Sequence, residues 1–308
     1  MMSPKIPTLM ISCRSRFVDQ VGFADVKADD VKDAIGFGIN NLFGQGPSRS
    51  AWSGFTEQFG DIIQPRLTYL AGGEPPDISV YSPNRRVLLC VHGYNSDWLR
   101  VQARYVQLIE QIAYRDYMGP YLTQTPKSWQ TKPSTTIPGA RYDCLIGYLW
   151  PSGLTAGPIG WITAKAQVRE AAKRLRTLLG WLNTINVPVT ISAHSLGCAV
   201  ALRALEGNTD SSVQKVILAG AAVPYDELRS QGDGFGYGAG RVKVAYSGRD
   251  RVLKYAYRAL HPFTPALGSR GLKPGEQYAA NIEAFDLTSS VFEHGGYNDS
   301  DDFVRLFE

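Results

Sequence analysis

Residues 191–198 read Ile-Ser-Ala-His-Ser-Leu-Gly-Cys, and this stretch decides the fold. The apolar, β-branched run that leads into it predicts a strand, and the small and apolar residues that follow it predict a helix. Ser195 therefore falls on a sharp strand-to-helix turn, which leaves its hydroxyl exposed above the end of the strand. Such a turn needs small residues two positions before and after the serine, and Ala193 and Gly197 occupy those positions.

Strand-like and helix-like runs alternate along most of the chain. Short apolar runs predict strands, and apolar residues spaced three or four apart predict the helices between them. The predicted strands are 87–91, 144–150, 187–193, 213–219, 242–246 and 281–285, with helices over 101–112, 163–182, 196–205 and from 299. This alternation indicates βαβ units, so we expect an α/β fold with a mostly parallel, twisted sheet and helices on both faces.

The chain has 308 residues, which is long enough for one large domain or two average ones. The alternation runs without a break from about residue 65 to the end, and 8–13 and 66–70 are candidate additional strands. We therefore predict a single domain over 1–308. Three segments are left over: 17–64, interpreted as an insertion or cover, and 117–141 and 254–280, interpreted as lid or pocket loops.

Composition excludes several classes of function. The formal net charge is +4 and no long basic run occurs, so nucleic-acid binding is not expected. No apolar stretch approaches the roughly 20 residues that a membrane-spanning helix needs. The N-terminal residues lack the apolar core and cleavage site of a secretory signal, and a cytoplasmic location is expected.

The four cysteines are Cys13, Cys90, Cys144 and Cys198. Three of them lie inside apolar runs, and no Cys-x-x-Cys spacing occurs, so we expect reduced thiols rather than disulfides or a metal site. Neither a metal nor a cofactor is expected.

A second motif, Val-His-Gly-Tyr-Asn at 91–95, follows directly after the strand predicted at 87–91. Acyl transfer places negative charge on a carbonyl oxygen, which preplaced backbone amides can stabilise. The amide of Leu196, directly after the serine, and that of Tyr94 are the candidate oxyanion donors. His92 lies at a strand end, where support of this loop is a better role than that of a base.

A serine needs a general base, which a carboxylate orients. His294 lies in a glycine-flanked loop after the last predicted strand, where a base belongs in an open α/β sheet, and His261 is the alternative. His194 adjoins the serine, so its side chain should leave the turn in another direction.

Asp250 is the candidate acid, because it follows the strand at 242–246 and completes the chain order Ser, Asp, His. An ordinary turn aspartate is the alternative interpretation of this residue. Asp226 and Asp286 are the other candidates for the acid.

The chain resembles the serine α/β-hydrolases, and most closely the lipase- and esterase-like bacterial families with unassigned substrates. Four motifs in order carry the resemblance, which covers about residues 85–308: His-Gly-Tyr-Asn at 92–95, Trp-Pro-Ser-Gly at 150–153, Ala-His-Ser-Leu-Gly at 193–197 and Ser-Gly-Arg-Asp-Arg-Val-Leu at 247–253. The resemblance implies an α/β-hydrolase fold. It also argues against dehalogenase and epoxide-hydrolase chemistry, which in this fold uses an aspartate at the position of Ser195.

These observations predict a serine hydrolase that cleaves a carboxylic ester or thioester of a small molecule through an acyl-enzyme, with Ser195, His294 and Asp250 as the triad. Lipase, thioesterase and peptidase activities stay open, as does the oligomeric state. A binding module with little turnover and an acyltransferase on the same triad are the alternatives. The aromatic-rich loops near Trp129 and Trp161 fit an acyl or aryl pocket and a packed cover equally well.

Overall fold

The structure is a computed structural model of the chain. It describes residues 8–12, 63–66, 86–96, 100–101, 103–105, 107–109, 111–112, 115, 141–142, 144–153, 157–184, 187–206, 213–229 and 239–308. The predictions for Cys13, for 17–62 and for 117–140 lie outside these residues.

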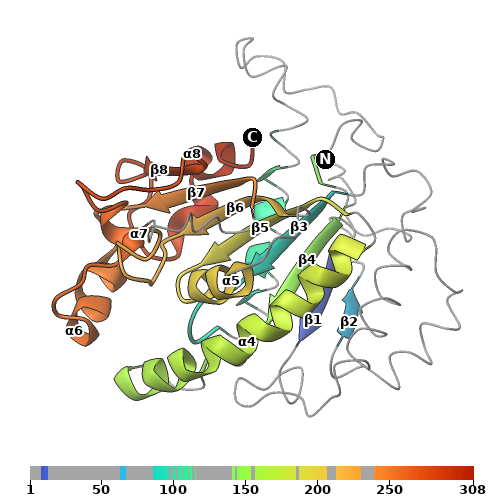
Figure 1. Ribbon diagram of the computed structural model, residues 1–308, viewed down its shortest axis with the longest axis horizontal. Coiled ribbons are helices and arrows are strands. Elements are labelled where there is room, and N and C mark those ends of the chain that lie inside the picture. The colour runs from blue at the N-terminus through green and yellow to red at the C-terminus, as the bar shows by residue number, and fades with distance from the viewer. Residues whose placement is uncertain are drawn as a thin grey trace, which may run out of the picture.

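An eight-stranded sheet forms the centre of the molecule (Figure 1). Its strands are β1 (Thr8–Ser12), β2 (Ile63–Arg66), β3 (Val87–Val91), β4 (Cys144–Leu149), β5 (Val189–His194), β6 (Val213–Ala219), β7 (Arg241–Tyr246) and β8 (Ile282–Asp286). The strand order is β2-β1-β4-β3-β5-β6-β7-β8, and every pair is parallel except β1 with β2. The predicted α/β class with a mostly parallel sheet is confirmed.

Helices lie on both faces of this sheet. The described helices are α4 (Pro158–Thr184), α5 (Gly197–Leu205), the π-helix η3 (Val252–Tyr257), α6 (Arg258–Leu260), α7 (Leu267–Arg270), the 3₁₀-helix η4 (Gly296–Asp299) and α8 (Asp301–Arg305). Helical residues also occur between 100 and 115. Figure 1 shows α4 and α5 over one face of the sheet.

The core is divided between the two faces because side chains alternate along each strand. In β3, Leu89 and its neighbours at 87 and 91 pack in the cluster that includes α4 and α5. Leu88 and Cys90 pack in a second cluster, with the helical residues near 105 and with α8. All five residues of β3 are buried, which explains why the strand reads as a continuous apolar run rather than an alternating one.

Several predicted strand bounds differ from the structure by one or two residues, and the larger differences are the following. The second described strand is Ile63–Arg66, so strand structure begins inside the segment interpreted as an insertion. Residues 67–70 of the strand predicted over 66–70 lie outside the described residues. α4 begins at Pro158, five residues before the predicted start, because proline at the first helical position lacks only an amide that has no helical acceptor. The segment 254–280 is not a loop throughout, since η3, α6 and α7 make parts of it helical.

The carboxyl ends of β5, β7 and β8 lie at one edge of the sheet, since these strands are parallel and adjacent in the order β5-β6-β7-β8. The turns that follow them carry Ser195, Asp250 and His294. Separately, none of the helices in the described part of the chain has the length and apolar character needed to cross a membrane.

Candidate active site

Ser195 occupies the turn between β5 and α5 in a left-handed conformation, with φ of 55°. This conformation costs a residue with a Cβ about 1–2 kcal/mol, so the surrounding structure must hold it. Two backbone hydrogen bonds do so: the Ser195 amide donates to the Ala219 carbonyl at 3.0 Å, and the Ala222 amide donates to the Ser195 carbonyl at 3.1 Å. The neighbouring strand β6 and its following loop therefore fix the turn.

Only glycine fits at position 197, the first residue of α5 after the turn. A Cβ at this position would lie 2.3 Å from the carbonyl oxygen of His92 and 2.7 Å from that of Val91. The start of α5 thus packs directly against the backbone at the end of β3. This contact explains in physical terms the small residue that the sequence motif demands.

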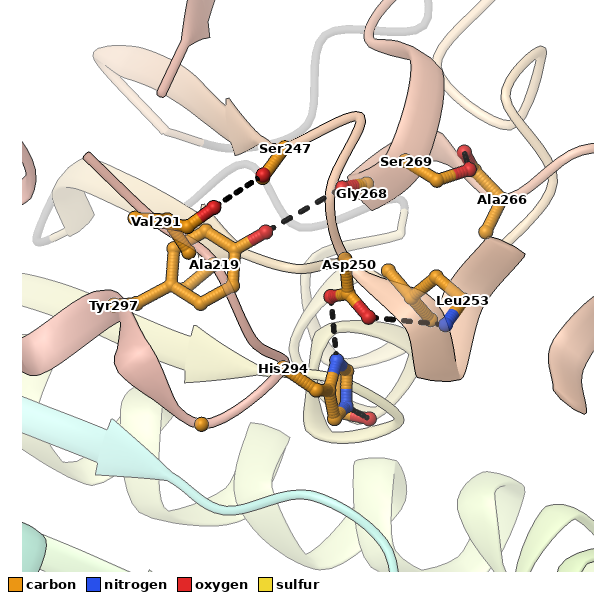
Figure 2. Close-up of polar contacts among 12 residues, drawn as sticks. Ala219, Ser247, Asp250, Leu253, Ala266, Gly268, Ser269, Val291, His294 and Tyr297 are labelled. Carbon is orange, nitrogen blue, oxygen red and sulfur yellow. Dashed lines mark hydrogen bonds and ion pairs between the residues drawn. The ribbon is translucent and has the colours of Figure 1, made fainter. Parts of the chain in front are cut away.

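The structure brings the three predicted residues together. The Oγ of Ser195 lies 2.8 Å from Nε2 of His294, and Nδ1 of His294 lies 2.7 Å from Oδ2 of Asp250. Figure 2 shows His294 and Asp250 in contact. An ionised carboxylate only accepts, so Nδ1 carries the proton and Nε2 presents its lone pair to the serine hydroxyl. This is the hydrogen-bond arrangement that a serine nucleophile and its base require.

Asp250 is fully buried. Its second carboxylate oxygen accepts from the Leu253 amide at 3.0 Å, at the start of η3, so both oxygens have donors (Figure 2). The loop that carries Asp250 is tied to the loop that carries His294, because Ser247 Oγ donates to the Val291 carbonyl at 2.6 Å. The other candidate acid at a strand end, Asp286, accepts from the amide of Thr288 instead of contacting a histidine.

Two further side chains hold the backbone on which the His294 ring is mounted, and sequence reasoning did not find either role. Nε2 of His194 lies 2.7 Å from the His294 carbonyl oxygen, and Arg104 donates to the Gly295 carbonyl at 2.6 Å. The His194 side chain thus contacts the backbone of His294. A carbonyl can only accept, so His194 is protonated on Nε2. No sequence signal marks Arg104, which comes from the helical residues after β3.

The electrostatics of His194 favour a neutral ring. Burial, followed by the proximity of the His294 ring, lowers its pKa from 6.5 to about 3. The two ring centroids are 4.7 Å apart. His194 therefore stays a neutral hydrogen-bond donor across the ordinary pH range.

His92 has the structural role expected of it. Its Nε2 accepts from the Trp150 amide at 3.1 Å, and Trp150 Nε1 donates to the His92 carbonyl at 2.8 Å. The rings also stack with centroids 5.6 Å apart. These contacts join the loop after β3 to the end of β4. Because Nε2 contacts Trp150 and Nδ1 contacts the Gly93 carbonyl, both ring nitrogens of His92 already have hydrogen-bond partners and neither is available as a general base.

The loop after β3 also approaches the serine closely. A Cβ on Gly93 would lie 2.7 Å from the Ser195 Cβ, so only glycine fits there. The next residues turn sharply, with Asn95 at φ 50° and its amide donating to the Ser152 carbonyl at 3.0 Å. Tyr94 lies between these two fixed points. Leu196 precedes the first residue of α5, where helix amides have no acceptor in their own helix.

Aromatic side chains form a cover above this loop. Trp161 on α4 makes edge contacts with Tyr94, Tyr257 and His261, with ring centroids 5.6, 6.1 and 6.4 Å apart. His261 stacks on Tyr257, and its Nε2 lies 2.9 Å from Lys165 Nζ. The structure thus places the alternative base in the cover, bonded to a lysine. Trp161 Nε1 is buried without an acceptor in the described part of the molecule.

The cysteines that the structure describes are buried free thiols. Cys90 and Cys198 form no disulfide, and burial raises the pKa of both. The side chain of Cys144 lies outside the described residues. In the described part of the chain, no group of three His, Cys, Asp or Glu side chains is placed to hold a metal ion.

The sequence also matches a known protein family. Residues 78–271 match the model of a family described as an alpha/beta hydrolase of unknown function. The chain belongs to this α/β-hydrolase family. The matched region includes Ser195, Asp250 and the loop after β3, whereas His294 lies beyond its end. No curated protein matches the chain at a significant level.

Proposed function

We propose that the protein is a serine hydrolase that cleaves a carboxylic ester or thioester through an acyl-enzyme. The continuous chain of hydrogen bonds from Ser195 Oγ through His294 to Asp250 is the observation that carries the proposal. The proposal accounts for the strained φ of Ser195 and for the burial of Asp250, neither of which a simple binding surface requires.

In the proposed reaction, His294 Nε2 takes the proton of Ser195 as its oxygen attacks the carbonyl carbon of the substrate. The tetrahedral oxygen accepts from the amides of Leu196 and Tyr94. His294 then gives the proton to the leaving alcohol or thiol, and the ester link to Ser195 remains. Water repeats the attack and releases the acid. Asp250 holds the proton on Nδ1 and stabilises the imidazolium through both proton transfers.

Labelling by a fluorophosphonate probe tests the nucleophile. The wild-type protein should be labelled, Ser195→Ala should not, and Ser192→Ala should be labelled as well as the wild type. Ser192 is a matched control because it is a buried serine on the strand that precedes the turn. Labelling that persists in Ser195→Ala would overturn the assignment, and a folded wild type that is never labelled would favour a binding module.

Hydrolysis of p-nitrophenyl esters with increasing acyl length tests the base and the acyl pocket. His294→Ala should lose nearly all activity, because His294 Nε2 lies 2.8 Å from the serine hydroxyl. His261→Ala should retain the chemical step and change the chain-length profile, since His261 lies in the aromatic cover. The reverse result would mean that the base has been misassigned. Product ratios with an added alcohol would distinguish hydrolysis from acyl transfer.

A further inference from the structure

In the described part of the molecule, the exposed large apolar side chains gather around the candidate active site. They are Ile159 and Ile162 (80% and 63% exposed), Val252 and Tyr255 (48% and 62%), Phe263 (95%) and Phe292 (59%). The first pair lies on the opening turns of α4 and the second pair on η3. Phe263 follows α6, and Phe292 precedes His294 by two positions. We refer to these six side chains as the apolar rim.

The segments that carry the apolar rim pack against one another. Trp161 on α4 contacts Tyr257 at the end of η3, with ring centroids 6.1 Å apart, and Lys165 contacts His261 just after α6. Arg249 lies over the ring of Phe292 at 4.8 Å. Figure 1 shows the opening turns of α4 and helix α6 projecting from the same part of the sheet. The segments that carry the rim on α4, η3 and α6 are therefore in contact with one another, and Phe292 is close in the chain to His294.

The exposed charges on the segments of the rim are mostly basic, although the half-buried carboxyl groups of Asp226 and Glu227 lie near Tyr257. Residues 157–169 and 251–275 contain no Asp or Glu. In the same segments, basic side chains are exposed at positions that flank the apolar ones: Lys165, Arg169, Arg251, Lys254, Arg258 and Arg270. Glu293, next to Phe292, is an exposed acid at the edge of the rim. A surface with apolar tips among cations favours an anionic, apolar partner.

We propose that the apolar rim and its flanking cations dock the protein on an anionic lipid surface, from which the ester substrate reaches Ser195. The second part of this inference rests on the proposed function. The rim side chains insert into the acyl region while Lys254 and Arg258 contact the headgroup phosphates.

A lipid surface fits the rim better than a folded protein partner does. The apolar tips project from separate helices and a loop, and a fluid bilayer accepts such tips without a complementary shape. A peptide or helix partner needs a groove, and neither of two cavities in the described part of the molecule, of about 460 and 280 Å³, is lined by a residue of the rim.

Co-sedimentation with vesicles tests the docking separately from catalysis. The Ser195→Ala protein is mixed with vesicles of phosphatidylcholine alone and with vesicles that contain 30 mol% phosphatidylglycerol. We expect binding to the anionic vesicles that falls as salt is raised, and at least about tenfold weaker binding to the neutral ones.

Two variants in the same background locate the surface. Phe263→Ser with Ile162→Ser, and separately Lys254→Glu with Arg258→Glu, should each lower binding to the anionic vesicles by at least about tenfold. Lys173→Glu with Arg241→Glu changes the net charge equally at exposed sites outside the rim and should bind like the parent. Equal loss in this control, or no binding to either vesicle, would overturn the docking surface.

Activity on a soluble ester separates the two proposals. If the rim substitutions, made in the chain that keeps Ser195, leave hydrolysis of p-nitrophenyl acetate as in the wild type and the same substitutions lower vesicle binding in the Ser195→Ala background, both proposals stand. If the wild type hydrolyses the soluble ester and never binds vesicles, only the docking fails. If vesicles bind as expected and no ester is cleaved, the proposed function fails and the lipid surface remains.

Discussion

Replacement of His194 by glutamine should remove a specific part of the protein's acid sensitivity. The unfolded chain protonates this histidine near its ordinary pKa of 6.5, whereas in the folded protein burial and the neighbouring His294 ring lower the pKa to about 3. The unfolded state therefore binds more protons between these two values. The contribution of His194 to stability is complete above pH 6.5 and is lost progressively as the pH falls towards 3.

The size of the effect follows from the two pKa values. Each unit below 6.5 removes about 1.4 kcal/mol, so the wild type should lose roughly 2 kcal/mol between pH 8 and pH 5 through His194 alone. The glutamine amide can donate to the His294 carbonyl as His194 Nε2 does, but it does not titrate. The variant should therefore keep the contact and lack this loss.

Urea unfolding of both proteins at pH 8 and pH 5 measures the difference. All other titrating groups are common to the two proteins, so the free energy of unfolding of the wild type should fall by about 2 kcal/mol more than that of His194→Gln. In a His294→Gln background the difference should shrink but persist, because burial is the larger cause. Parallel pH dependence in all four proteins would refute the reasoning.

Three further substitutions have defined outcomes. Gly197→Ala should prevent folding or lower the melting temperature sharply, because the new Cβ would lie 2.3 Å from the His92 carbonyl oxygen; a wild-type melting curve would contradict this. Gly180→Ala, within α4 and with no atom within 4 Å of the new Cβ, should instead raise the free energy of unfolding by about 0.5–1 kcal/mol in urea titrations. Asp250→Asn should fold and lose about 10⁴-fold in kcat on a p-nitrophenyl ester, because an amide that donates to Nδ1 reverses the tautomer of His294; retained activity would exclude the proposed acid.

Most of the described sheet could be predicted from the sequence, because its strands are buried on both faces. β3 and the second half of β6 stand out as apolar runs for this reason, and the predicted bounds of these two strands match the structure. The turn at Ser195 could also be predicted from neighbouring residues, since a strand, a small residue on each side of the serine and a helix specify its geometry. β2, at the antiparallel edge of the sheet, gave no comparable signal, and its start at Ile63 was not predicted.

The partners of Ser195 depended on tertiary structure. The residues next to His294 and Asp250 in the sequence do not predict that the two side chains contact each other. Each lies in a loop whose position is set by the order of the parallel strands. The same order brings the His194 side chain under the His294 backbone and aligns Arg104 with the next residue. These contacts join positions 100 and 191 residues apart, so no pattern along the chain could contain them.

The sequence by itself determined where the chain would run as strand and helix and which serine would stand on the sharp turn, since both follow from periodicity and from the size of adjacent residues. Only the tertiary structure decided which histidine and aspartate reach that serine, that His194 is a neutral donor to the His294 backbone, and that the segments with exposed apolar residues pack together. Each of these depends on which segments pack side by side. That choice is made by burial across the whole sheet rather than by neighbours along the chain.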